Sequence, residues 1–114
     1  MIPKFRTWNS ETKEIEVFQT YEEISELFLA LSADDGFYSI MQSTCLFDKN
    51  GKEIFEGDIV LVLDSPYTVF YDTEKGSYRL KPHDDRWNVD YMSNFSHGGN
   101  FEVVGNIYEN KEYL

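Results

Sequence analysis

The residues that could act as nucleophiles or proton carriers are one cysteine, Cys45, and two histidines, His83 and His97. A reactive thiolate needs a histidine or another positive group beside it. Both histidines lie far along the chain from Cys45, in polar segments with the composition of loops. No serine stands in the Gly-x-Ser-x-Gly pattern of a hydrolase nucleophile. We therefore predict that the protein is not an enzyme, unless the fold brings Cys45 against a histidine.

Carboxylates could bind a cation or catalyse hydrolysis, and they occur in adjacent pairs at Asp34–Asp35 and Asp84–Asp85. Hydrolases use two acids in different environments, whereas adjacent aspartates in loop segments are both solvated. Residues 48–51, Asp-Lys-Asn-Gly, begin like a calcium loop, but their glycine comes fourth instead of sixth. One cysteine and two histidines without paired spacing do not predict zinc. We expect no catalytic residue, no metal and no cofactor.

Negative charge is the clearest chemical feature of the chain. It has 21 acidic and 10 basic residues, for a formal net charge of −11. Nucleic acids and anionic membranes bind through Lys and Arg, so direct contact with either is disfavoured. The charge could serve solubility alone, or it could attract a basic partner. We predict a candidate partner surface at the five acids that lie between positions 21 and 36, where no basic residue occurs: Glu22, Glu23, Glu26, Asp34 and Asp35.

An amphipathic helix is predicted to carry most of these acids. Thr20 and Glu23 have the spacing of a capping box, and a glycine at position 36 suits the end of the helix. Apolar residues recur at steps of three and four, which places them on one helix face: Tyr21, Ile24, Leu27, Phe28 and Leu31.

A β-hairpin is predicted before this helix, because residues 4–8 and 13–18 alternate between polar and apolar types around a turn. We expect Phe5, Ile15 and Val17 on its buried face. Residues 1–36 are thus expected to form an N-terminal hairpin and helix.

Short strands and tight turns dominate the rest of the chain. Asn50-Gly51 predicts a turn, and the apolar run 59–63 predicts a strand buried on both faces. Residues 83–100 follow neither the helix nor the strand period. The predicted fold class is therefore mainly β (α+β), with a small barrel over 37–114 that we expect to form one compact unit with the preceding part. Five aromatic residues could give this barrel a face for strands of nucleic acid or for peptides: Tyr67, Phe70, Tyr71, Tyr78 and Trp87.

Residues 40–60, read as IMQSTCLFDKNGKEIFEGDIV, closely resemble the signature of the YopX family of phage and prophage proteins of Gram-positive bacteria. The opening Pro3-Lys4-Phe5-Arg6-x-Trp8 and the closing residues 101–110 are also similar to that family. The family usually has glycine where this chain has Cys45, and cysteine tolerates positive φ poorly.

The resemblance implies an SH3-like barrel in the C-terminal part, a phage origin, a location in the bacterial cytoplasm and a possible homo-oligomer. It implies no activity and no functional residues. We therefore expect an uncharacterised accessory protein that acts by protein–protein interaction or self-assembly, with an unknown protein partner. The alternative is a nucleic-acid-related module, either an acidic DNA mimic that inhibits a host protein or a single-strand binder.

Overall fold

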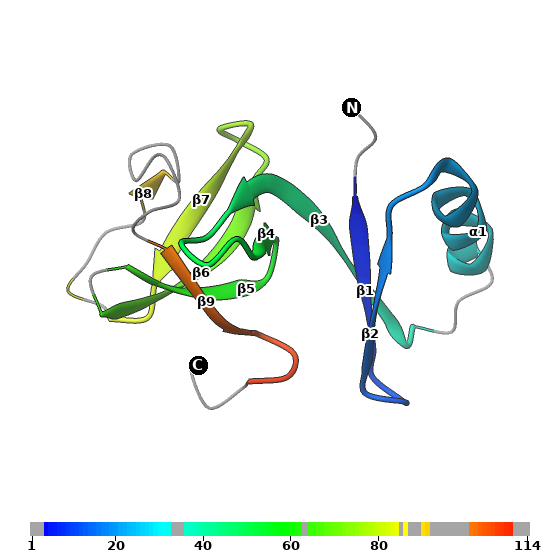
Figure 1. Cartoon of the computed structure of the whole chain (residues 1–114), viewed down its shortest axis with the longest axis horizontal. Helices are drawn as coiled ribbons and strands as arrows, with labels where there is room; N and C mark the ends of the chain where they lie inside the picture. The colour runs from blue at the N-terminus through cyan, green and yellow to red at the C-terminus, as the bar shows by residue number, and fades with distance from the viewer. Residues whose placement is uncertain are drawn as a thin grey trace. The chain divides into compact units, whose positions relative to one another are not determined.

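The computed structural model describes residues 4–32, 36–62, 64–84, 86, 90–91 and 101–110. The chain divides into two compact units, Met1–Ser43 and Thr44–Leu114, and each is described by itself. Strands dominate both, with one helix among the described residues (Figure 1). The prediction of a mainly β protein is confirmed at this level.

The first unit begins with the predicted hairpin. Strand β1 (Phe5–Asn9) pairs antiparallel with β2 (Glu14–Phe18) and with the first half of β3 (Tyr38–Phe47). The Asn9 side chain closes the turn, because its Oδ1 accepts hydrogen bonds from the amides of Glu11 and Thr12. The polar turn residues in the sequence therefore predicted this hairpin for the right physical reason.

The predicted buried face of the hairpin is wrong. The register pairs Phe5 with Phe18 but Val17 with Arg6, so Phe5 and Val17 lie on opposite faces of the sheet. Val17 is 44% exposed, whereas Arg6, Thr7 and Trp8 of β1 are buried. β1 is flanked by β2 and β3, and alternation within one strand does not reveal which strand takes this central place.

Helix α1 (Tyr21–Ser32) begins at the predicted capping box. The Glu23 amide donates to Thr20 Oγ1 at 3.1 Å, and the Thr20 amide donates to the Glu23 carboxylate at 3.2 Å. Leu27 is the buried residue of the helix, and the Phe28 ring meets Phe5 edge-on with centroids 5.9 Å apart. The helix thus packs on the sheet face that carries Phe5.

The second unit is built on a five-stranded antiparallel sheet in the order β8-β7-β6-β5-β9. Its strands are β5 (Asp58–Val62), β6 (Ser65–Asp72), β7 (Ser77–Pro82), β8 (Asp90–Tyr91) and β9 (Phe101–Asn106). The short β4 (Glu53–Phe55) pairs with β3 as the edge of the other sheet. Among the described strands, β8 and β9 lie at the two edges of the five-stranded sheet. Because a closed barrel has no edge strands, we call this sheet a half-barrel.

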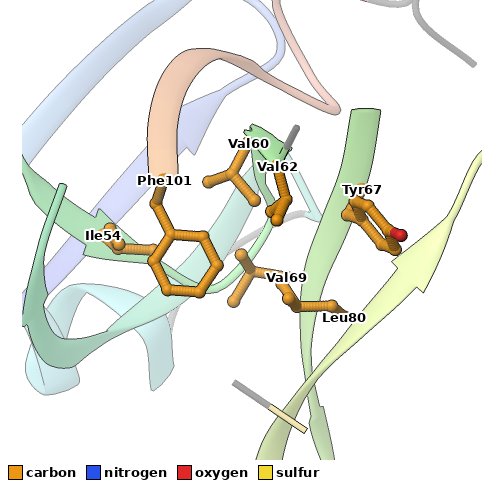
Figure 2. Close-up of a cluster of buried hydrophobic side chains, with 7 residues drawn as sticks. All are labelled: Ile54, Val60, Val62, Tyr67, Val69, Leu80 and Phe101. Atoms are coloured by element: carbon orange, nitrogen blue, oxygen red, sulfur yellow. The ribbon is translucent and has the colours of Figure 1, made fainter. Parts of the chain in front are cut away.

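The core of the second unit gathers apolar side chains from five of its strands. The Phe101 ring of β9 lies among Ile54, Val60 and Val69 (Figure 2). As predicted, β5 is buried along almost its whole length. These contacts explain why the strongly apolar run lies in an interior strand, between β6 and β9. The whole cluster is Ile54, Val60, Val62, Tyr67, Val69, Leu80 and Phe101.

The boundary between the units falls inside β3. Residues 38–42 pair with β1, which groups them with the hairpin. The sequence pattern placed residues 37–43 in the C-terminal part, because the helix was predicted to end at Gly36 and a new strand to follow it. The structure places the boundary between Ser43 and Thr44.

Candidate protein-binding surface

The acids of the predicted partner surface have different surroundings. Glu22 and Glu26 are both exposed and lie one turn apart on α1. Glu23 is half-buried, and its carboxylate takes part in the helix cap. Asp34 and Asp35 lie outside the described residues. The structure therefore brings Glu22 and Glu26 together and gives Glu23 a structural task.

Exposed apolar side chains accompany these acids in the first unit. On α1, Tyr21 is 70% exposed, Leu29 72% and Phe28 52%. Several large apolar side chains exposed on one short helix are typical of an interaction site on a small protein. The sequence indicates this exposed apolar surface at one position, Leu29, because this leucine lies outside the predicted apolar face of the helix. Further large exposed apolar residues of the same unit are Val17, Phe37, Tyr38 and Ile40.

A hollow of about 200 Å³ lies between α1 and the sheet of the first unit. We call it the helix–sheet hollow. Most of its lining is apolar, but it contains one carboxylate from the sheet and one from the helix. Its residues are Glu16, Phe18, Glu26, Leu27, Ala30, Leu31 and Tyr38.

The strand register explains why these residues meet. Phe18 pairs with Phe5, Glu16 pairs with Thr7, and Tyr38 pairs with Asn9, so all three point to the sheet face that carries Phe5. That face is the one on which α1 packs. The helix contributes residues at steps of three and four, which project from one side of it toward the sheet.

The polar groups of the hollow are not satisfied from within the described part of the chain. The carboxylates of Glu16 and Glu26 and the hydroxyl of Tyr38 form no hydrogen bond or ion pair with any described residue. Helix α1 has no basic residue in its last turn. The hollow is therefore apolar, anionic and free of an internal counter-ion within the residues the structure describes.

A family model, that of the YopX protein, matches residues 4–114. The chain belongs to the YopX family. It is also similar to the crystal structure of protein EF1440 from Enterococcus faecalis, with 26% sequence identity and a TM-score of 0.63. That similarity covers 100% of this chain and 99% of the other. Comparison with the curated proteins gives no match.

The residues of the YopX signature include a buried aspartate, Asp48, whose carboxylate holds a turn together. Asp48 Oδ1 accepts hydrogen bonds from the amides of Asn50 and Lys52, and Oδ2 accepts one from Val103. Burial alone raises the pKa of Asp48, but these backbone hydrogen bonds, together with the charge of Lys52, leave the pKa below its ordinary value of 3.8. The segment that began like a calcium loop is a turn whose carboxylate is already occupied.

The closing residues of the YopX match form a compact turn. Asn106 Oδ1 accepts hydrogen bonds from the amides of Tyr108 and Glu109, and the Asn106 amide donates to the Asn110 side chain. A Cβ atom on Gly105 would collide with the Asn110 side chain. The packing of the Asn110 side chain therefore leaves no room for a side chain at position 105, which explains the glycine there.

Cys45 and His83 are the described residues among the nucleophile and proton-carrier candidates. Cys45 is exposed and has a φ of 64°, the left-handed conformation for which the family's glycine is suited. His83 lies 2.7 Å from Thr68 Oγ1 through its Nε2 atom. His97 lies outside the described residues.

Asp84 of the second aspartate pair forms an ion pair with Arg86. Asp84 is held by Arg86, which lowers the pKa of Asp84 to about 2, and Asp85 lies outside the described residues. No group of three or more His, Cys, Asp or Glu residues that could hold a metal ion occurs in the described ranges.

The described aromatic residues of the half-barrel differ in exposure, from the buried Tyr67 to the exposed Tyr71. Tyr67 belongs to the core, while Tyr71 and Tyr78 pack edge-to-face on each other with centroids 5.1 Å apart. Phe70 is half-buried, and Trp87 lies outside the described residues.

Burial raises the pKa of Tyr78, with smaller contributions from Glu56, Cys45 and Tyr71. Across the same described residues, no helix is long and apolar enough to cross a membrane.

Proposed function

We propose that this YopX protein is a non-enzymatic accessory protein of a phage or prophage that acts by binding another protein in the bacterial cytoplasm. The observation that carries the proposal is the surface of the first unit. There, exposed apolar side chains lie beside carboxylates that have no partner among the described residues.

Energetics favour a partner over simple exposure to water. Burying an apolar side chain contributes roughly 1.5–3 kcal/mol, and Tyr21, Phe28 and Leu29 all remain largely exposed. Aromatic and long aliphatic residues of this kind form the centre of protein interfaces, with charged residues at the rim. The exposed Glu22 and Glu26 supply such a rim and would select a basic partner.

A capture experiment with matched variants tests this proposal. The tagged chain is used to recover proteins from a lysate of a Gram-positive bacterium, alongside Tyr21→Ser/Leu29→Ser and a control with the same number of exposed apolar residues removed from the second unit, Leu46→Ser/Phe47→Ser. We expect one protein to be recovered repeatedly by the wild type and the control and lost with the α1 variant. Circular dichroism establishes that all three are folded.

Two results would contradict the proposal. One is a protein that recovers no partner and is monomeric by light scattering. The other is a partner whose recovery is the same for all three chains, which would place the interface elsewhere. A homo-oligomer in light scattering that dissociates in the Tyr21→Ser/Leu29→Ser variant would instead support the self-assembly form of the proposal.

The acidic DNA mimic is the second candidate, and the charge of −11 favours it over direct single-strand binding. Stacking on bases needs accessible aromatic faces, whereas Tyr67 is buried and Tyr71 and Tyr78 contact each other. An SH3-like closure of the half-barrel stays a prediction from the family.

A further inference from the structure

We infer that the helix–sheet hollow binds a lysine or arginine side chain that a partner protein presents between apolar side chains. The inference rests on the proposed function and names the chemistry of the partner. It places the anchor of the interaction in one defined part of the first unit.

The shape and lining of the hollow fit a basic side chain with a long stem. Lysine and arginine lay their methylene groups along apolar surface and keep the charged end near polar groups. Phe18, Leu27 and Leu31 provide apolar lining for such a stem. Glu16 from β2 and Glu26 from α1 provide carboxylates from two different elements, so a cation inside could reach both.

The electrostatics of the helix end favour the same occupant. Ala30 and Leu31 line the hollow and belong to the last turn of α1, where the helix dipole is negative. No basic residue occupies that turn. Neither Glu16 nor Glu26 has an ion-pair partner among the described residues. A cation from outside would therefore not have to displace one that is already there.

Charge also favours a basic side chain over three other occupants: a second copy of the chain, an anionic membrane and a nucleic acid. A second copy of the chain carries the same net charge of −11, and an anionic membrane or a nucleic acid would be repelled by both carboxylates. A segment of another protein with alternating basic and apolar side chains meets both requirements of the surface. Its apolar residues would contact exposed side chains such as Leu29, which lies three positions from Glu26 on α1.

The test is a titration of the full, isotope-labelled chain with three synthetic peptides, followed by NMR of the backbone amides. One peptide is amphipathic and made of leucine and lysine, the second replaces its lysines by glutamate, and the third replaces its leucines by serine. We expect the leucine–lysine peptide to shift the amides of Glu16, Leu27 and Ala30. The lysine–serine peptide should bind much more weakly, and the leucine–glutamate peptide should not bind.

Matched variants distinguish the hollow from general attraction to an acidic protein. Glu16→Gln/Glu26→Gln removes two charges from the hollow, and Glu11→Gln/Glu74→Gln removes two charges from exposed turns. Exposed ion pairs of this kind predict a roughly 2- to 30-fold weaker binding for the first variant and a smaller change for the second. Ala30→Phe fills the hollow without changing the charge and should abolish the specific shifts. Ser25→Phe, which adds the same ring on the helix outside the hollow, should preserve them.

Equal weakening by both glutamine variants, or unchanged binding by Ala30→Phe, would overturn the inference. So would amide shifts that depend on protein concentration without peptide, because they would make a second copy the occupant. A partner that the capture experiment recovers and that binds Glu16→Gln/Glu26→Gln with the same affinity as the wild type would refute this inference while leaving the proposed function in place.

Discussion

Asp48 Oδ2 accepts a hydrogen bond from the backbone amide of Val103, 2.9 Å away and 55 positions later in the chain. The amide of Lys49 also donates to the carbonyl oxygen of Phe101. The turn after β3 is thereby joined to the last strand of the half-barrel. The aspartate of the YopX signature thus acts as a link between the middle and the end of the second unit.

Replacing Asp48 by alanine should destabilise the protein by about 3 kcal/mol, because three backbone amides lose a charged acceptor and one of them is remote in sequence. Urea denaturation measures the loss. Asp48→Asn keeps one acceptor oxygen and should cost less. An alanine variant as stable as the wild type would show that water satisfies these amides equally well.

The same carboxylate predicts an acid dependence of stability. Because the pKa of Asp48 is lower in the folded protein than its ordinary 3.8, its contribution is complete above that value. The contribution is lost as the pH falls below 3.8 through the folded pKa. Urea denaturation at a series of pH values gives the free energy of unfolding. As the pH falls over this range, that free energy should decrease less steeply for Asp48→Ala than for the wild type. Parallel curves would refute the assignment.

Cys45→Gly should stabilise the protein by about 1 kcal/mol, because glycine adopts the observed positive φ without steric cost. Cys45→Ala is the control, since it removes the thiol but keeps the Cβ atom. Thermal unfolding should show a higher Tm for the glycine variant than for the alanine variant. Equal Tm values would mean that the backbone at position 45 carries no strain.

Gly105→Ala should destabilise the second unit by roughly 1–3 kcal/mol, because the added methyl group collides with the Asn110 side chain. Asn110→Ala removes the two closest atoms of the obstacle, Oδ1 and Cγ, but also the hydrogen bond to the Asn106 backbone amide. Once that single change is made, adding Gly105→Ala should cost little more. A double-mutant cycle in urea measures this coupling, and strictly additive losses would contradict it.

Thr20→Ala should destabilise α1 by about 1 kcal/mol, because the Glu23 amide loses its capping oxygen. Ser25→Ala, an exposed change in the middle of the same helix, should have a much smaller effect. The loss of helical signal in thermal circular dichroism separates the two variants. Equal unfolding temperatures would show that the cap is dispensable.

Local signals predicted the elements of this fold well. The capping box at Thr20 and Glu23 located the start of the helix, and the apolar run around Val60 identified a strand that is buried on both faces. Both patterns depend on neighbours in sequence, which is why they could be read without coordinates. The buried face of the hairpin was missed, because whether Val17 faces solvent depends on cross-strand register and on the central position of β1.

The candidate surface was predicted only in part. Charge counting located Glu22 and Glu26, but it also placed Glu23 on the surface, although the capping-box spacing already paired Glu23 with Thr20. Glu16 was missed, because it lies on β2 and meets Glu26 only when the helix packs on the sheet. Contacts between a strand and a helix depend on tertiary packing, which no local pattern in the sequence specifies.

The continuity of β3 across the boundary between the units restricts how related genes could recombine. A crossover between Ser43 and Thr44 would fuse two halves of one strand from different parents. A slip of a single residue there would reverse the orientation of every side chain beyond it. Inheritance of the two units as exchangeable modules would therefore require parents whose strands agree residue for residue at this point.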